Sequence, residues 1–428
     1  MGVGGGAGSP HPTASAPTAI PAHLVELLRP EPDADAAIVV VSAPNRRRRA
    51  AVRAALGGDL AVVEPLAVVG PHDSPSHLIP LRAGPVRYVL DRVAGGRLLG
   101  AVVTGVPGWP TVLERLLPNV AYVARRGGTG TVPLVQSSWR GENGATIVVG
   151  FDGSNPVRVA KVAAARRIRD EERALATVAR SAERAGVEVP QPDGVVPIGD
   201  RAALLERPLE GRSAARLLAH SSRKLEPLLE RLASWLEAWA TATREVRPLD
   251  DAMLEASVHA PARELAGVAD PVYLEWLAEL ARRLAGTPFP HTAAHNDLTM
   301  WNVLLPHTGR LGILDWEAAE PVALPLGDLV YATVDAVAAT KRYRSRPAAF
   351  AECFVRGGAH QAHVGLLLGR LIAKVGLEPD AAVLCFHACW LRHAANEERQ
   401  RPPARGTPFL EIVRMLAGRP GGFPVTAP

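Results

Sequence analysis

Three polar side chains in one short segment have the types and spacing that phosphoryl transfer requires. Residues 294–317 read A-H-N-D-L-T-M-W-N-V-L-L-P-H-T-G-R-L-G-I-L-D-W-E and contain Asp297, Asn302 and Asp315. A carboxylate can accept the proton of an attacking hydroxyl group, and carboxylate and amide oxygens are hard ligands for Mg²⁺. The segment therefore predicts a site at which a hydroxyl group meets a metal-bound phosphate.

The apolar residues of the segment predict the element that positions these side chains. Residues 303–305 and 311–314 are apolar and flank a turn at 307–310 that contains a glycine. Two short apolar runs around such a turn are typical of a β-hairpin. The hairpin would place Asn302 before its first strand and Asp315 after its second, which brings both close to Asp297.

The order of these residues also carries a resemblance to a known family. The pattern H-x-D-x-x-x-x-N, formed by 295–302 and followed by Asp315 in I-L-D-W-E, resembles the catalytic loop and metal-binding motif of the aminoglycoside phosphotransferase and choline kinase-like family, relatives of the protein kinases. The resemblance implies that Asp297 is the catalytic base and that His295 is structural. It implies that Asn302 and Asp315 bind magnesium.

One position departs from the family pattern. Asn296 stands where the family usually has a glycine after the histidine. Asparagine adopts left-handed backbone angles more readily than most residues, so we expect the turn to be preserved.

The resemblance extends upstream to residues that would bind the nucleotide. Lys161 in V-A-K-V resembles the strand lysine that contacts the α- and β-phosphates. The helix that follows offers Glu171 as its ion-pair partner, with Glu172 left open as the alternative. Ser138 and Gly141 lie where a nucleotide-covering loop belongs, although G-x-G-x-x-G is absent.

Two further segments match the family. Glu206 in L-E-R-P resembles the hinge that joins the two lobes and meets the adenine. Asp328 in P-L-G-D-L matches a segment that opens a helix and supports the site, and by itself it reads as a helix N-cap.

The whole chain is predicted to be α+β, with a two-lobed protein-kinase-like fold and an additional small α/β region at its N-terminus. Strands are expected at 131–138, 145–152, 157–162, 194–197 and 202–206, and a charged helix at 164–185. Helical spacing of apolar residues resumes at 225–239 and again from 326. The expected divisions are a disordered tail (1–22), a small α/β region of unknown role (23–126), the N-lobe (131–207) and a helical C-lobe (208–420).

Composition limits the partners. The net charge of +5 is mild, and the densest basic run, 46–49, has no interleaved aromatic residues, which favours a solvated helix face over a nucleic-acid site. No apolar run is long enough to span a membrane, and 1–22 has no signal-peptide pattern, so we expect a cytoplasmic protein without nucleic-acid or membrane partners. Three cysteines, at 353, 385 and 389, predict buried free thiols.

The resemblance implies an ATP- or GTP-dependent phosphotransferase, a small-molecule kinase whose acceptor is a hydroxyl group of an aminoglycoside, sugar or amino alcohol. The carboxylates available for a polycationic aminoglycoside are Glu320, Glu352, Glu397 and Glu398. The alternative is a pseudokinase-like module that binds nucleotide without turnover, and the complete catalytic set argues against it. A stripe of His387, Trp390 and His393 would line either a substrate pocket or, as is commoner, the core.

Overall fold

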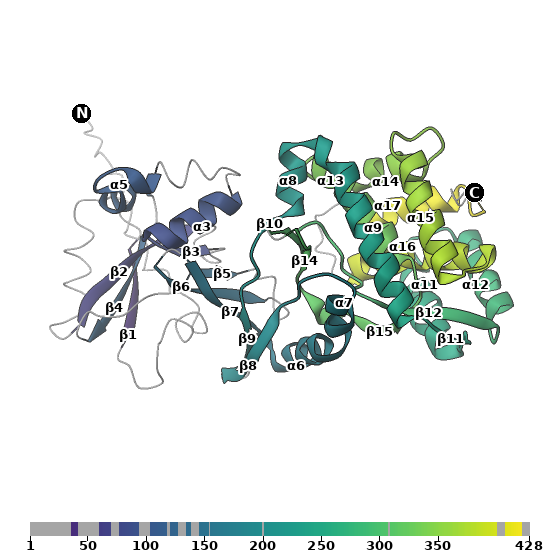
Figure 1. Ribbon diagram of the computed structural model, residues 1–428, viewed down its shortest axis with the longest axis horizontal. Helices are drawn as coiled ribbons and strands as arrows, with labels where there is room; N and C mark the ends of the chain where they lie inside the picture. Colours follow the sequence, from purple (N-terminus) through teal and green to yellow (C-terminus); the bar gives the residue numbers. More distant parts are fainter. Residues whose placement is uncertain are drawn as a thin grey trace, which may run out of the picture. The chain divides into compact units, whose positions relative to one another are not determined.

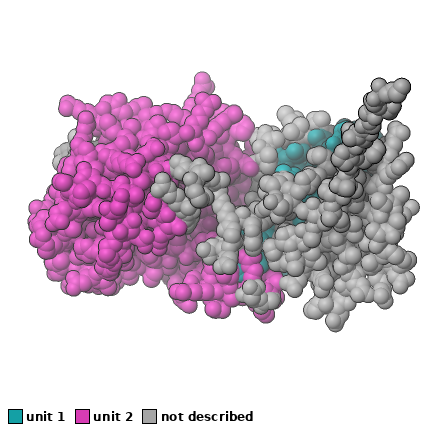
Figure 2. Space-filling view, turned by 180° about the vertical axis from the view of Figure 1, so that it is seen from behind, with its two compact units in different colours: residues 1–163 teal, residues 164–428 magenta. Residues whose placement is uncertain are grey.

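The structure of the protein, a computed structural model, forms two compact units, residues 1–163 and 164–428, which Figure 2 distinguishes by colour. Helices and strands both contribute, which confirms the α+β class. The predicted tail 1–22, the basic run 46–49, and Ser138 and Gly141 lie outside the described residues. The structure describes residues 36–41, 60–69, 77–93, 103–117, 120–126, 134–137, 145–153, 155–198, 201–306, 309–399 and 407–421.

The first unit is built on an antiparallel sheet with helices beside it (Figure 1). Along this unit the strands follow the order β1-β4-β2-β3-β5-β6-β7. The elements are β1 (Ala36–Val41), β2 (Leu60–Val69), β3 (His77–Pro80), α3 (Ala83–Val93), α5 (Trp109–Leu116), β4 (Val120–Arg126), β5 (Leu134–Ser137), β6 (Thr146–Asp152) and β7 (Asn155–Ala164).

The N-terminal region of this unit shares a sheet with the strands predicted for the N-lobe. β3 pairs antiparallel with β5. One buried apolar cluster combines Trp109 of α5 with Val149 and Phe151 of β6. The elements before β5 therefore extend this sheet and share one buried cluster with its later strands.

The second unit is mostly helical (Figure 1). The charged helix expected at 164–185 consists of α6 and α7 joined by a π-helical turn, η2.

The lobe boundaries at 131–207 and 208–420 stay a prediction. The elements are α6 (Ala165–Ala174), η2 (Leu175–Ala179), α7 (Arg180–Arg184), β8 (Gln191–Ile198), β9 (Arg201–Arg207), β10 (Arg212–Ser213), α8 (Ala214–His220), η3 (Ser222–Lys224), α9 (Leu225–Thr243), β11 (Glu245–Pro248), α10 (Asp251–Leu254), η4 (Glu255–His259), α11 (Ala260–Leu265), α12 (Pro271–Leu284), β12 (Pro288–Ala294), β13 (Val303–Leu305), β14 (Gly312–Ile313), η5 (Trp316–Ala318), β15 (Glu320–Ala323), α13 (Gly327–Thr340), α14 (Arg346–Phe354), α15 (Gln361–Val375), α16 (Pro379–Arg399) and α17 (Pro408–Ala417).

Two small sheets hold the segment that carries the predicted chemistry. β12 lies between β11 and β15, and β13 lies between β10 and β14, so the predicted hairpin is confirmed as β13–β14. Residues 295–302, called the catalytic loop from here on, connect β12 to β13. Gly211 precedes β10 with a φ of 118°, and a Cβ atom there would lie 2.8 Å from the backbone of Leu305. Only glycine allows both this angle and this approach.

Trp316, which follows Asp315, anchors the end of the hairpin in the core. Its ring is fully buried, 5.8 Å from the ring of Trp239 on α9 and 4.8 Å from that of His295. Its Nε1 donates to the carbonyl oxygen of Ile313 at 2.9 Å. The buried indole ring therefore fixes the backbone on which Asp315 is carried.

The three cysteines are free and buried, as expected. Burial raises the pKa of each thiol well above its ordinary value, which keeps them protonated and unreactive. Among the described residues, no helix combines the length and the apolar character that crossing a bilayer requires.

The stripe on α16 belongs mainly to the core. Trp390 is fully buried, and the hydroxyl group of Tyr273 lies 2.8 Å from Nδ1 of the buried His387. His393 stacks on Tyr331 with ring centroids 3.9 Å apart and also faces a cavity discussed below.

We expect His387 to make a contribution to the stability of the second unit that is lost as the pH falls from about 6.5 to about 4. Burial lowers the pKa of His387 from 6.5 to about 4. Between these values the unfolded chain binds more protons than the folded one, so acid favours unfolding, by on the order of 3 kcal/mol at the lower end. Urea denaturation at pH 7.5 and pH 4.5 measures the difference.

Two matched variants test this assignment. His387→Gln keeps an acceptor for Tyr273 but cannot take up a proton, so it should reduce the loss of stability in acid. His220→Gln changes an exposed histidine and should leave that loss as it is. Equal acid sensitivity in wild type and His387→Gln would contradict the expectation.

Candidate active site

The hairpin brings the predicted polar residues together. The N–H of Leu314 donates to the carbonyl oxygen of Asn302 at 2.9 Å. The side-chain amide of Asn302 donates to the carbonyl oxygen and to Oδ2 of Asp297, at 3.0 and 3.3 Å. Asp315 lies close enough to Asp297 to perturb its ionisation. The three residues singled out by type and spacing therefore share one site.

Asp328 holds the start of the catalytic loop. Its carboxylate oxygens accept the N–H groups of His295 and Asn296 at 2.7 and 2.8 Å. Asn296 has a φ of 65°, the left-handed angle expected for it, and its side chain donates to the carbonyl oxygen of Ala318 at 3.0 Å. The N-cap of α13 is Leu326, so the N-cap interpretation of Asp328 was wrong. The carboxylate instead binds the loop backbone.

His295 joins the two sides of the site. Its Nε2 lies 2.9 Å from the carbonyl oxygen of Leu314, and its Nδ1 lies 3.3 Å from the backbone nitrogen of Asp297. A carbonyl oxygen only accepts and a backbone N–H only donates, so the ring carries its proton on Nε2. This geometry suits the structural role expected for His295.

Asp297 lies where a negative charge is disfavoured. Partial burial, followed by the charges of neighbouring carboxylates, raises its pKa to about 7. A hydrogen bond from Asn302 opposes the shift. A carboxylate with a pKa near neutrality can both take up and release a proton in a catalytic cycle. The neighbouring carboxylates, in decreasing order of effect, are Asp315, Asp335 and Glu317.

Three carboxylates of the second unit have the geometry of a cation site. Glu171 of α6, Asp315 and Glu317 each present an oxygen atom, and these atoms lie within 4.8 Å of one another. Hard oxygen ligands in such a cluster suit Mg²⁺. The donor set therefore fits a magnesium ion; it includes the predicted ligand Asp315 and adds two carboxylates that were not predicted as ligands.

Arg167 of α6 fixes the orientation of Glu317. Its Nε and Nη2 each donate to one oxygen of the Glu317 carboxylate. This bidentate pair sets the plane of the carboxylate and joins two segments 150 residues apart in the chain. The arginine also offsets part of the repulsion among the clustered acids.

Asp335 braces the other end of the catalytic loop. It is buried, and its Oδ2 accepts the N–H of Met300 at 2.7 Å and the hydroxyl group of Tyr343 at 2.9 Å. Its Oδ1 accepts Nη2 of Arg346 at 2.7 Å. Asp335 and Asp328 are two helical turns apart on α13, so one helix face holds both ends of the loop.

The remaining residues predicted to bind nucleotide are found on separate elements. Lys161 lies on β7 opposite Ile147 of β6 and is 6% exposed. Glu206 lies on β9 and is 8% exposed. Glu171 is buried, whereas Glu172 is only partly so. The nucleotide-binding roles of these residues, and of Ser138 and Gly141, stay predictions.

Sequence reasoning did not identify Glu317, Asp335 or Arg167. Glu317 stands two positions after Asp315, and Asp335 stands seven after Asp328, a spacing that places two residues on one face of a helix. Those spacings could have indicated both carboxylates. Arg167 has no such local signal, because its partner is distant in the sequence.

Residues 145–363 match the profile of the phosphotransferase enzyme family, which covers just over half of the chain. The chain belongs to the phosphotransferase enzyme family. This confirms the resemblance to the aminoglycoside phosphotransferases and the kinase-like fold that it implied. The protein is thus a phosphotransferase acting on small molecules, and the catalytic loop and the carboxylate cluster just described lie within the matched residues.

Comparisons with individual proteins are more distant. A search of curated proteins finds no match. A thermostable mutant of aminoglycoside phosphotransferase APH(4)-Ia is 14% identical, covering 67% of this chain and 94% of its own, with a TM-score of 0.45. Aminoglycoside phosphotransferase APH(3'')-Id from Streptomyces rimosus is 20% identical, covering 59% and 91%, with a TM-score of 0.38.

We expect the phosphotransferase to tolerate glycine at position 296 and to be weakened by alanine. Glycine adopts the φ of 65° without strain. Alanine, whose methyl group cannot form the local hydrogen bonds of asparagine, costs about 1 kcal/mol at this left-handed angle. Asn296→Gly should retain kcat within a few-fold, and Asn296→Ala should lower the free energy of unfolding by about 1 kcal/mol. Denaturant titration and steady-state kinetics measure both, and an equally stable alanine variant would argue against a strained turn.

Proposed function

We propose that this phosphotransferase moves the γ-phosphate of ATP or GTP to a hydroxyl group of a small molecule of the aminoglycoside, sugar or amino-alcohol class. Asp297 accepts the proton of the acceptor hydroxyl. The acceptor oxygen forms a bond to the γ-phosphorus, and the bond between that phosphorus and the β,γ-bridging oxygen breaks. The nucleoside diphosphate leaves with the electron pair of the broken bond.

The other residues hold and orient the reactants. Asp315 and Asn302 would bind Mg²⁺, with further carboxylates of the cluster within reach. Held there, the ion would supply positive charge that offsets the charge of the phosphate oxygens. Lys161, paired with Glu171, would position the α- and β-phosphates. The loop with Ser138 and Gly141 would cover the nucleotide, and the segment with Glu206 would meet the base.

One observation carries the proposal: the hydrogen-bonded pair of Asp297 and Asn302 beside Asp315. The pair places a carboxylate with a pKa of about 7 next to oxygen ligands suited to a metal ion. Phosphoryl transfer depends mainly on positioning and on charge stabilisation, and the types and placement of these residues support a role in both. Family membership supports the same reaction class.

The test measures the release of nucleoside diphosphate from ATP or from GTP while the magnesium concentration is varied. Each measurement is repeated with aminoglycosides, sugars and amino alcohols as acceptors. Mass spectrometry of the acceptor identifies the phosphorylated product. We expect magnesium-dependent release that requires an acceptor, with a raised KM for the nucleotide in Lys161→Met.

Two other outcomes would contradict the proposal in different ways. Tight binding of magnesium and nucleotide without transfer to any acceptor would favour the pseudokinase-like alternative. A failure to bind nucleotide would refute both hypotheses.

A further inference from the structure

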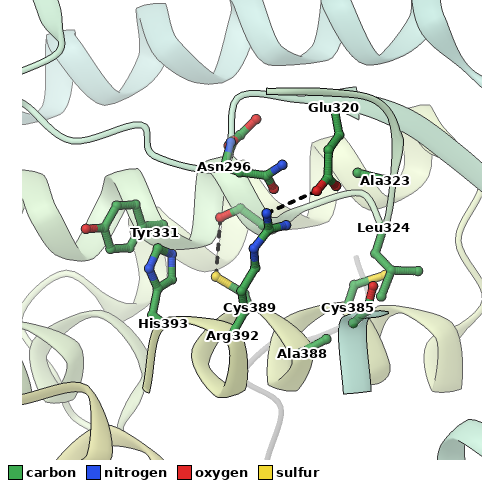
Figure 3. Close-up of a pocket in the computed structure, with 13 residues that line it drawn as sticks. Asn296, Glu320, Ala323, Leu324, Tyr331, Cys385, Ala388, Cys389, Arg392 and His393 are labelled. Atoms are coloured by element: carbon green, nitrogen blue, oxygen red, sulfur yellow. Dashed lines mark hydrogen bonds and ion pairs between the residues drawn. The ribbon is translucent and has the colours of Figure 1, made fainter. Parts of the chain in front are cut away.

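A cavity lies beside the catalytic loop in the second unit. Its lining includes Asn296, which precedes the proposed base, and Asp328, which holds the loop. Arg392 and Glu320 meet across it, with Nη2 and Oε1 3.1 Å apart. Figure 3 shows the Arg392 side chain extending from α16 toward Glu320 and Asn296. A molecule in this cavity would therefore lie next to the segment that carries Asp297.

A larger cavity of about 490 Å³ lies beside this one. Ser257, Glu320 and Arg392 line both, so the two cavities adjoin. The volume is within the range typical of small-molecule sites. We call the combined space the acceptor cavity.

The charges that line the larger part of the acceptor cavity are balanced. An acceptor with several amino groups would require an excess of carboxylates, because each buried or half-buried cation needs a partner. The lining of the larger part instead has equal numbers of both signs: Arg247, Arg392, Arg399, Asp250, Glu264 and Glu320.

Two of the lining carboxylates are already engaged by the protein. Glu320 pairs with Arg392. Asp250 is the N-cap of α10, where its Oδ1 accepts the N–H of Met253 at 2.8 Å. Both carboxylates keep their charge, so the lining of the larger part stays neutral overall and offers no excess of carboxylates to a polycation.

The acidic residues that the sequence offered for a polycation are engaged as well. Glu352 forms an ion pair with Lys341. Glu397 accepts the N–H groups of Phe409 and Leu410 at 2.9 and 3.2 Å, at the start of α17. Neither lines the acceptor cavity as the structure describes it.

Arg247 provides an independent indication of the sign of the ligand's charge. It lies on β11 and is half-buried, and its Nε is buried without a hydrogen-bond partner among the described residues. A buried guanidinium N–H without an acceptor is costly, and an anionic oxygen entering the cavity would satisfy it.

From these observations we infer that the acceptor is a hydroxyl compound carrying an acid group, of the sugar-acid or sugar-phosphate class, and that the arginines of the acceptor cavity bind that group. The inference rests on the proposed function, since it names the substrate class of the same site. Of the acceptor classes proposed above, it selects acidic sugars and excludes polycationic aminoglycosides.

Sugars with and without an acid group, and a polycation, test which charge the cavity prefers in a ligand. D-glucuronate and D-glucose 6-phosphate each add an acid group to the frame of D-glucose, and kanamycin supplies a polycation. We expect calorimetry with the full chain, magnesium and a non-hydrolysable ATP analogue to show about 10- to 100-fold tighter binding of one acidic probe than of glucose. With ATP, kcat/KM should follow the same order.

Variants locate the effect. Arg247→Gln and Arg392→Gln should each reduce the preference for the acidic probe over glucose by about tenfold or more. Arg370→Gln is the matched control, because Arg370 pairs with Glu230 and Glu237 on helices away from the cavity lining and should leave the preference unchanged. The comparison of probes on the unaltered protein stands even if a cavity variant does not fold.

The outcomes separate this inference from the proposed function. Selective binding of an acidic probe without phosphate transfer supports the inference and contradicts the proposed function. Phosphate transfer to kanamycin or glucose with a higher kcat/KM than to either acidic probe overturns the inference and leaves the function in place. Binding of neither acidic probe at 10 mM, a roughly thousandfold weaker affinity than a 10 µM site would show, overturns it too.

Discussion

Replacing Asp297 by asparagine is expected to lower kcat by about 10²–10⁴. The amide cannot accept the proton of the acceptor hydroxyl, although its oxygen can still accept the hydrogen bond from Asn302. The KM for the nucleotide should change little, because the proposed phosphate-binding residues lie elsewhere. Single-turnover kinetics with saturating magnesium and ATP measure the chemical step directly.

The stability of the same variant distinguishes lost chemistry from lost structure. The folded-state pKa of Asp297 is about 7, well above the 3.8 of an ordinary aspartate, so the contribution of this one group to stability falls as the pH rises from about 4 through 7. An uncharged amide at this position would remove that penalty, and at pH 8 Asp297→Asn should be at least as stable as wild type. A variant that is both inactive and less stable would count against Asp297 as the base.

Replacing Asp335 by alanine is expected to produce the largest loss of stability among single changes near the site. The substitution removes three hydrogen bonds to a buried carboxylate and leaves the Arg346 guanidinium without its ion-pair partner. Breaking a buried pair costs about 3–5 kcal/mol, and since Arg346 retains 25% exposure we expect about 2–4 kcal/mol. Denaturant titration provides the free energy of unfolding.

The surface pair of Arg283 and Asp380 provides the control for this change. Its nitrogen and oxygen lie 2.9 Å apart, but both side chains are more than half exposed. Asp380→Ala should therefore cost less than about 1 kcal/mol. The side-chain oxygen of asparagine in Asp335→Asn can still accept the N–H of Met300, so this variant should retain more activity than Asp335→Ala. If Asp380→Ala and Asp335→Ala lose the same free energy of unfolding, Asp335 does not brace the loop.

The β13–β14 hairpin could be predicted from the sequence because adjacent residues specify it. Apolar runs around a glycine-containing turn specify β13 and β14, and Asn302 and Asp315 directly adjoin those strands. The left-handed angle at Asn296 followed from the residue type alone. Lys161 was placed correctly on a strand for the same reason, because alternation with apolar neighbours is a property of adjacent residues.

The acceptor cavity and the supports of the catalytic loop were decided by tertiary structure. Arg167 meets Glu317, and Arg392 meets Glu320, only because packing brings distant helices and strands together. Which carboxylates are engaged, and which charges face a cavity, depends on those contacts and not on spacing along the chain. The sequence alone determined the reaction class of this protein, through adjacent residues with fixed chemistry; the sign of the charge that its cavity offers an acceptor arises from long-range packing, which local patterns do not encode.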